Sequence, residues 1–400
     1  MGQILINIIN ILRSFSSGLF AIIFVLYLQY WKIGPLEIGL FAAVSVVISG
    51  TYTIVFTRLA SRFSPYLFLI ISAVLMVISG LIFSLANNII WFWIACLCGF
   101  IPPAGGLFVN ALEEGIIANV LASKRTRVFA IYGMLGTAGG ALGALSATIP
   151  SLMNWGEVRG IHYLFWFYTS IALISLVVSL MLFKNQGFVT VEKIPQEKKL
   201  ELFSQKLDGK ALVLVRKMAL LFVADSFGSG IVTSTLLIFW FHHYFHFNLG
   251  ELGIIFFLVD ITSAISFPIA EVISRYIGLL NTAVFTHIPS SLLLVAIPFV
   301  PNGYIAAALL ITRGILVEMD VPTRQSYLAS IVNKSGRAQA AGMTSLGKQI
   351  GRTAGPILGG SLLAASNAVA PFVAGGVVKI AYDLALWRSF KKVKQHNDDK

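Results

Sequence analysis

Residues 66–86 read YLFLIISAVLMVISGLIFSLA and contain no charged side chain. A helix of about 20 apolar residues crosses the hydrocarbon core of a bilayer, so this stretch predicts a transmembrane helix. The whole chain has a similar character, because 57% of its 400 residues are hydrophobic and 12% are charged. A soluble domain carries about 25% charged residues. We therefore expect an all-α membrane protein.

Apolar stretches of this kind recur along the chain, and we count twelve. They lie near residues 6–31, 36–57, 66–86, 89–121, 128–149, 160–183, 218–241, 251–274, 279–300, 303–332, 339–365 and 368–388. Proline, glycine and charged residues interrupt the stretches at 89–121 and 303–332, so we expect a helix break in one of them.

The net charge of +12 follows the predicted topology. Predicted cytoplasmic segments hold 21 of the 29 Lys and Arg residues, whereas predicted outer loops hold Lys32 and Arg159. This bias is the positive-inside rule. It predicts a multi-pass protein of the cell (plasma) membrane with both termini in the cytoplasm. Since topology accounts for the basic excess, we expect no nucleic-acid partner.

A polar segment divides the chain near its middle. Residues 184–217 are rich in Lys, Glu and Gln and are expected to form a cytoplasmic linker. The predicted domains are therefore a six-helix bundle at 1–183, a second six-helix bundle at 218–390 and a cytoplasmic tail at 391–400.

The two predicted bundles repeat in sequence. RSFSSGLF at 13–20 matches DSFGSGIV at 225–232, and PLEIGLF at 35–41 matches LGELGIIF at 249–256. The spacing from Glu114 to Arg127 also recurs from Arg324 to Arg337, and all these matches have an offset between 210 and 214 residues. Because six is an even number of helices, the two halves are expected to be parallel repeats.

Two parallel halves of six helices, joined by a long loop, resemble the major facilitator superfamily over essentially the whole chain. The loop motif of that family, roughly Gly-x-x-x-Asp-Arg-x-Gly-Arg-Arg, corresponds to TRLASRFSP at 57–65. Arg62 fits this motif, whereas Ser61 replaces the acidic residue. The preceding Arg58 and the second-half Arg275 complete the candidate loop positions. The resemblance implies the major facilitator fold and a secondary transporter that works by alternating access.

A second motif lies in the predicted helix at 339–365. It resembles the Gly-x-x-x-Gly-x-x-x-Gly-Pro-x-x-Gly-Gly helix of proton-driven drug exporters, although those proteins carry it in the fifth helix. Small residues in such a stripe let helices approach closely, so tight packing alone is the alternative. The motif residues are Gly347, Gly351, Gly355, Pro356, Gly359 and Gly360.

Ionisable residues inside predicted spans are the candidates for binding a solute or a proton, or for gating. Each costs about 2.5–3.5 kcal/mol at the centre of a membrane helix, so it needs a functional or pairing role. The candidates are Arg13, Glu113, Glu114, Asp225, Asp260, Asp320, Arg324, Lys348 and Arg352. Structural ion pairs that only stabilise the bundle are the alternative for all of them.

Two pairings are expected among the ionisable residues. Arg13 and Asp225 occupy equivalent positions of the repeat, and the family resemblance places their helices opposite each other across a central cavity. We therefore expect a bridge between them that opens and closes. Lys379 and Asp383 lie four residues apart on one helix face and are expected to satisfy each other.

These observations favour a proton-coupled transporter of a small solute that acts as a monomer. One carboxylate among Asp225, Glu113 and Glu114 is expected to exchange a proton during the cycle. Export of a drug-like or cationic compound is favoured, with uptake of a polar nutrient or an anion as the alternative. A non-transporting receptor or scaffold is a third possibility, against which the buried charge argues.

No catalytic or cofactor motif is present in the sequence. The chain lacks a Walker A loop, a G-x-S-x-G elbow and an H-E-x-x-H pair, so we expect no enzymatic activity and no cofactor. His242 and His246 lie one helical turn apart and share a face. Few other metal ligands lie near them in sequence, so no metal site is expected.

Overall fold

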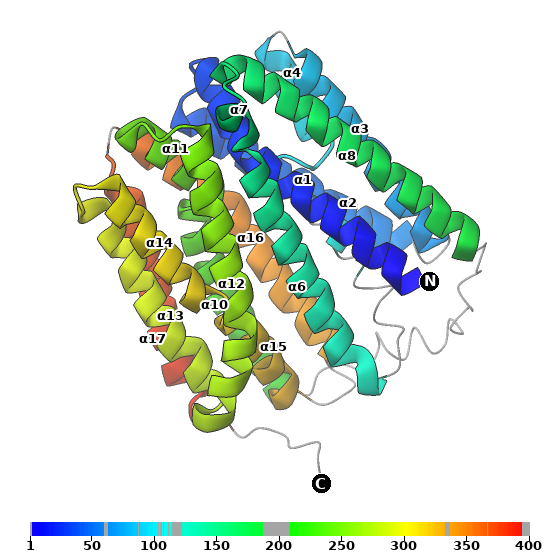
Figure 1. Ribbon diagram of the computed structural model, residues 1–400. Helices are drawn as coiled ribbons and strands as arrows, with labels where there is room; N and C mark the ends of the chain where they lie inside the picture. Colours follow the sequence, from blue (N-terminus) through cyan, green and yellow to red (C-terminus); the bar gives the residue numbers. More distant parts are fainter. Residues whose placement is uncertain are drawn as a thin grey trace. The chain divides into compact units, whose positions relative to one another are not determined.

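The computed structural model describes residues 2–59, 63–86, 88–102, 104, 106, 108–110, 112–113, 122–186, 209–332, 337–365 and 367–393 (Figure 1). Every regular element in this part of the chain is a helix. Eight of these helical segments are long and apolar enough to cross a membrane. The other four predicted spans correspond to shorter, broken or less apolar helices, which are α4 (Ile89–Cys96), α6 (Ala122–Ser146), α14 (Gly303–Val317) with α15 (Asp320–Ile331), and α16 (Arg337–Ala364).

The chain divides into two compact units. The first contains Met1–Glu192 and Thr233–Ile261, and the second contains Lys193–Val232 and Thr262–Lys400. The predicted bundle boundaries at residues 183 and 218 stay a prediction. Most of the predicted linker and of the predicted tail, at 187–208 and 394–400, lies outside the described residues.

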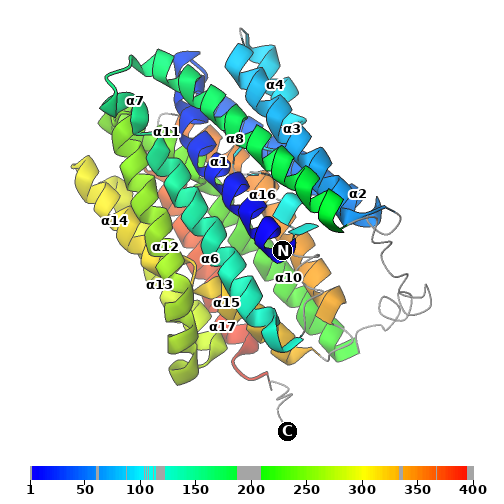
Figure 2. The same ribbon diagram turned by 45° about the vertical axis from the view of Figure 1, so that its right-hand side comes forward.

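The first unit is organised around its first helix. α1 packs along α6 and α8, and α3 packs along α8 (Figure 2). Buried aromatic rings fill the space between these helices, with Phe20 in contact with Phe83 and Tyr168 at centroid distances of 5.0 and 4.9 Å. The helices that lie wholly in this unit are α1 (Gly2–Tyr30), α2 (Pro35–Leu59), α3 (Pro65–Leu85), α4, α6, α7 (Ile149–Leu152), α8 (Glu157–Gln186) and α11 (Ser234–Phe245).

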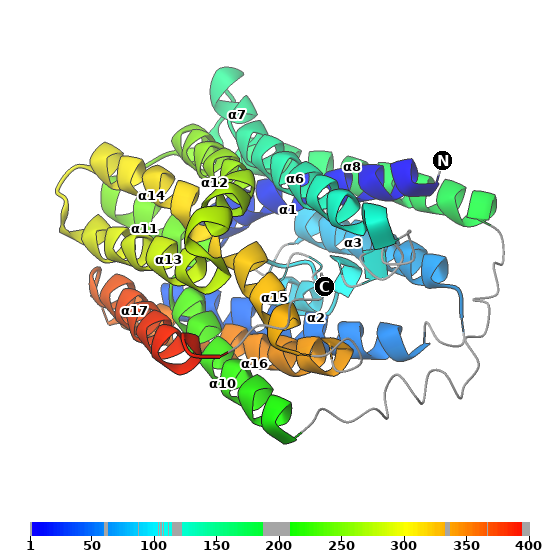
Figure 3. The same ribbon diagram turned by 90° about the horizontal axis from the view of Figure 1, so that it is seen from below.

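The second unit is organised around α10 (Gly209–Ile231), which packs along α16 and α17 (Ala370–Phe390) (Figure 3). On the other side of α17 lies α13 (Leu279–Ala296), which also contacts α14 and α15. The short 3-10 helix η1 (Ile297–Phe299) connects α13 to α14. α12 (Leu249–Ile277) begins in the first unit and ends in the second.

The expected helix break is confirmed within 303–332. α14 ends at Val317, α15 begins at Asp320, and a turn lies between them. In the stretch at 89–121, α4 ends at Cys96, and Gly99 follows with a φ of 73°, a left-handed conformation that glycine adopts readily. A further break, after Ile231, was not predicted. There Thr233 caps α11 by accepting a hydrogen bond from the Leu236 backbone N–H.

Glycines bring α6 against α1 in the first unit and α16 against α10 in the second. A Cβ atom at Gly143 would lie 2.7 Å from the carbonyl carbon of Phe15 and closer still to its oxygen. A Cβ atom at Gly355 would lie 2.5 Å from the carbonyl oxygen of Phe227. Gly355 and Phe227 each follow their first-unit counterparts by 212 residues. The sequence repeat therefore recurs as the same helix contact inside each unit.

The glycine motif of α16 contacts α10 along more than one turn. A Cβ atom at Gly347 would lie 2.6 Å from the carbonyl oxygen of Ala219, and one at Gly351 would lie 2.6 Å from the backbone nitrogen of Phe227. Real Cβ contacts are longer than 3.0 Å, so neither position has room for a side chain without a shift of the backbone. Close packing is thus one role of this motif.

Candidate functional site

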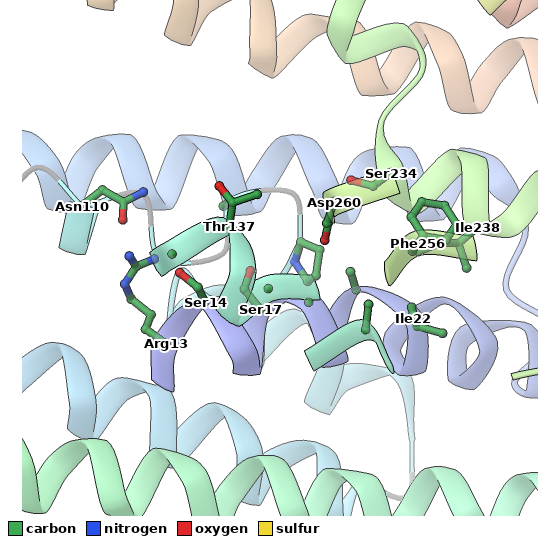
Figure 4. A pocket seen from close by; sticks show the side chains of 17 residues that line it. Arg13, Ser14, Ser17, Ile22, Asn110, Thr137, Ser234, Ile238, Phe256 and Asp260 are labelled. Carbon is green, nitrogen blue, oxygen red and sulfur yellow. The ribbon is translucent and has the colours of Figure 1, made fainter. Parts of the chain in front are cut away.

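A cavity of about 330 Å³ lies inside the first unit, lined by α1, α6, α11, α12 and residues of the 102–110 segment. Figure 4 shows Arg13 and Asn110 at one end of it and Ile22, Ile238 and Phe256 at the other. Between these ends the lining carries one carboxylate, that of Asp260, and several hydroxyl groups. The hydroxyl groups belong to Ser14, Ser17, Thr137 and Ser234. The cavity can therefore receive a solute that has both a polar and an apolar part.

Arg13 connects this cavity to a buried polar network. Its Nη2 donates hydrogen bonds to Oδ1 of Asn10 at 2.8 Å and to Oε2 of Glu113 at 3.3 Å. The Tyr132 hydroxyl donates to the same Glu113 oxygen, and the Asn10 amide donates to the Tyr132 carbonyl at 2.8 Å. Glu113 has no exposed surface. A carboxylate in such a place needs its cation, so Arg13 is held between the cavity and Glu113.

The second unit contains a larger charge network, centred on Asp225 of α10. Arg324 of α15 contacts Asp225 at 2.6 Å, Asp320 at 3.0 Å and the Tyr382 hydroxyl at 3.2 Å. Lys379 of α17 lies 3.6 Å from the other oxygen of Asp225. These side chains are all buried. Three helices that are distant in sequence are thus joined by paired charges, as buried ions in a membrane protein require.

Arg13 and Asp225 were expected to pair with each other, but each has its partners within its own unit. Arg13 pairs with Glu113, which is 100 residues later, and Asp225 pairs with Arg324, which is 99 residues later. The two pairs occupy nearly equivalent positions of the repeat with the charges reversed. The sequence showed the equivalence, but it could not show that each half carries its own counter-ion.

The expected pairing of Lys379 with Asp383 was wrong. Lys379 donates to the Ser229 hydroxyl at 2.6 Å and lies near Asp225, whereas Asp383 contacts Nδ1 of His287 at 2.9 Å. Helical spacing places Lys379 and Asp383 on one face of α17, but each of them pairs with a residue of a neighbouring helix instead. His287 was missed because it stands alone in the apolar helix α13. Counting histidine among the costly intramembrane residues would have found it.

Two other basic candidates lie on α16. The Lys348 ammonium is 5.0 Å from the centroid of the Phe222 ring, and the Arg324 guanidinium lies 4.6 Å from the same centroid. These distances are typical of cation–π contacts. Arg352, one turn after Lys348, is exposed.

The loop candidates contribute little to either network. Arg275 pairs with Glu271 at 2.6 Å, and both side chains are about 70% exposed (72% and 69%). Arg62 lies outside the described residues, as do the side chain of Arg58 and the candidate Glu114. Within the described part of the chain, no three His, Cys, Asp or Glu residues gather as metal ligands would. His242 contacts the Phe247 carbonyl through its Nδ1 at 2.7 Å.

Apolar helices that enclose paired charges and a polar cavity are typical of α-helical membrane proteins that carry solutes. Residues 6–321 match the family model described as Major Facilitator Superfamily. Since this match covers most of the chain, the protein belongs to the major facilitator superfamily. It is a multi-pass membrane protein and a secondary transporter of a small solute. Residues 252–399 also match a model described as Transmembrane secretion effector.

Relatives of known sequence or structure agree with this assignment. An uncharacterized membrane protein of Saccharomyces cerevisiae is 26% identical in an alignment 408 positions long. The alignment covers 94% of this chain and 91% of the yeast protein. The structure of the nucleoside transporter NupG is 13% identical, with a TM-score of 0.71 over 98% of this chain and 99% of NupG. A D-xylose-proton symporter is 13% identical, with a TM-score of 0.74 over 96% of both chains. At these identities the two structures show the shared fold alone.

Proposed function

We propose that this transporter exchanges protons for a small amphipathic cation and exports that cation from the cell. The observation that carries the proposal is the double role of Arg13, which lines the cavity and is also the counter-ion of Glu113. A proton taken up by Glu113 would release Arg13. The freed guanidinium would then turn to another carboxylate of the same cavity, Asp260, and displace a cation bound there.

The cavity lining supports a cationic, amphipathic solute. The ionisable residues among its described lining are Arg13, which has Glu113 as counter-ion, and Asp260. A carboxylate offers about four acceptor positions, so Asp260 can receive a solute amine beside any protein partner. Ile238 and Phe256 provide an apolar wall for the remainder of the solute.

Among the buried acids, Glu113 is the one best suited to exchange the proton. Asp225 lies near two bases, Arg324 at 2.6 Å and Lys379 at 3.6 Å, and these favour its ionised form. Among the described residues, the basic partner of Glu113 is Arg13, at the longer distance of 3.3 Å. If Arg13 turned away into the cavity, the Glu113 carboxylate would become an uncompensated buried charge, and binding a proton would remove that cost. Glu114 remains a further candidate.

The direction and the cellular setting are part of the proposal. The match of residues 252–399 to transmembrane secretion effectors supports export. The setting we propose is the plasma membrane, and the distribution of basic residues supports an orientation with both termini in the cytoplasm. A monomer suffices, because one chain contains both halves of the repeat, with bundles at 1–183 and 218–390.

The test uses purified protein in liposomes that contain a pH-sensitive dye. A pH gradient is imposed, and cationic dyes, sugars and organic anions are added in turn. We expect cationic compounds alone to change the lumenal pH, and Glu113→Gln and Asp260→Asn to abolish the change. Glu271→Gln is the matched control, because that carboxylate is also paired with an arginine but is exposed. Normal proton exchange in both cavity variants would refute the mechanism.

Uptake of a polar nutrient or an anion is the second candidate, and the observation that favours it is the position of Arg13 in the lining. In that case an acidic solute would itself draw Arg13 from Glu113, and the proton and solute would travel together. The same liposomes distinguish the two functions. A response to organic anions that persists in Asp260→Asn and disappears in Arg13→Gln would favour uptake.

A further inference from the structure

The pair formed by His287 and Asp383 takes no part in the mechanism above. His287 comes from α13 and Asp383 from α17, and both carboxylate oxygens lie within 2.9–3.0 Å of Nδ1 of the imidazole. The exposed fractions of the two side chains are 2% and 1%. Within the described part of the chain, His287 is the polar partner found for Asp383. A buried carboxylate of this kind is compensated only if the imidazole carries a proton.

The charges around this pair come from every neighbouring helix. α10 contributes Asp225, α15 contributes Asp320 and Arg324, and α17 contributes Lys379 and the Tyr382 hydroxyl. Two acids and two bases in this set balance each other. The more distant groups are Arg313 of α14, Glu318 after it, and Lys348 and Arg352 of α16. Since the nearest charges are balanced among themselves, the histidine and aspartate must reach neutrality on their own.

We propose that His287 and Asp383 form a buried proton-binding site, and that its proton decides whether Lys379 pairs with Asp225 or with Asp383. The inference rests on the proposed function only in assuming that the transport cycle moves protons. With the proton bound, the imidazolium compensates Asp383, and Lys379 stays near Asp225. This is the arrangement of contacts in the structure.

Loss of the proton would leave Asp383 without its counter-ion. Lys379 lies one turn earlier on the same face of α17, within reach of that carboxylate. To reach Asp383, Lys379 would give up its contact with Asp225 at 3.6 Å and its hydrogen bond to Ser229 at 2.6 Å, and the charge of the uncompensated Asp383 would offset that loss. Asp225 would keep Arg324, which contacts it at 2.6 Å. The pairing expected from helical spacing and the pairing found in the structure thus become two states of one switch.

The step breaks and forms few bonds. The N–H bond of the imidazolium breaks, its proton passes to the aqueous phase, and the electron pair stays on the imidazole nitrogen. The Lys379 ammonium keeps its protons and exchanges Asp225 for Asp383 as an acceptor. Five groups take part in this step, which are His287, Asp383, Lys379, Asp225 and Arg324. Their total charge falls by one, the charge of the proton that leaves.

The test measures protonation without transport. Full-length protein labelled with ¹⁵N-histidine is titrated in detergent micelles, and the His287 signal among the six histidines is assigned by its loss in His287→Gln. We expect this signal to change from that of imidazolium to that of imidazole during the titration. In Asp383→Asn, the titration should move or disappear. A His287 signal that does not titrate in the wild-type protein would overturn the proposal, and His287→Asn supplies the assignment if His287→Gln does not fold.

The role of Lys379 has its own readout. The ammonium competes with the proton for Asp383, so Lys379→Met should change the pH dependence of the His287 signal. Lys391→Met is the matched control, because Lys391 follows the same helix but is exposed and lies 4.0 Å from the Trp387 ring centroid. An equal midpoint in the wild type and Lys379→Met would refute the switch. Because no solute is used, this result does not depend on the liposome experiment. Proton-coupled flux with a silent His287 would refute this inference alone.

Discussion

Replacing Gly143 by alanine should weaken the contact between α1 and α6. The added Cβ would lie 2.7 Å from the carbonyl carbon of Phe15 and 3.0 Å from the backbone nitrogen of Leu19. Ordinary contacts begin near 3.4 Å, so the two backbones must separate locally by more than about 0.7 Å, because the carbonyl oxygen of Phe15 lies closer still than its carbon. No side-chain rotation can relieve this overlap, because the neighbouring atoms belong to the backbone. Overpacking of this kind typically costs about 1–3 kcal/mol.

Gly133→Ala provides a matched control in the same helix. Nothing lies within 4 Å of a Cβ at this position. Alanine in the interior of a helix is favoured over glycine by about 0.5–1 kcal/mol, so this variant should be as stable as the wild type or slightly more stable. Because the gain in helix propensity is common to both substitutions, the two variants are expected to differ by the overpacking cost alone, about 1–3 kcal/mol.

The two cysteines of the chain provide the assay. Cys96 and Cys98 are both buried in the first unit, so a thiol-reactive fluorescent dye labels them when that unit unfolds. We expect labelling at a lower temperature in Gly143→Ala than in the wild type and no such decrease in Gly133→Ala. Equal unfolding temperatures for the two variants would show that α1 and α6 do not make the close contact described above.

Three further predictions concern polar residues. Tyr132→Phe removes the hydroxyl donor to Glu113, and because hydrogen bonds to charged groups contribute about 1.5–3 kcal/mol, the dye assay should show a loss of that order. Lys379→Met should abolish proton-driven flux in liposomes while lowering the unfolding temperature only modestly, because Asp225 keeps its arginine. Glu271→Gln breaks an exposed pair, and such pairs contribute little, so neither flux nor unfolding temperature should change measurably.

The helices and the repeat could be predicted from sequence because both depend on local composition. The stretch at 66–86 had to be a membrane helix, and the 212-residue offset is found again in the contacts of Gly143 and Gly355. The break after Ile231 was missed, since the sequence VTS contains no proline or glycine there. Its signal was the capping residue Thr233, a preferred N-cap in the middle of an apolar stretch.

Partners of the buried charges were harder to predict than the charges themselves. Hydrophobicity selects the ionisable residues that need a counter-ion, and Arg13 and Asp225 were found in this way. Which side chain provides that counter-ion depends on the rotation and neighbours of each helix, which composition does not encode. Lys379 illustrates this, because its partner in sequence was Asp383 and its partners in space are Asp225 and Ser229.

The reversed ion pairs of the two halves have a consequence for biosynthesis. Arg13 obtains its counter-ion from a residue made 100 positions later, and Asp225 obtains its own 99 positions later. At about 5–20 residues per second, each charge waits roughly 5–20 s on the ribosome for its partner. Neither waits for the other half of the chain. Arg13 can thus be neutralised before the second half of the chain has left the ribosome, so each of the two ion pairs can form in the order in which it is translated.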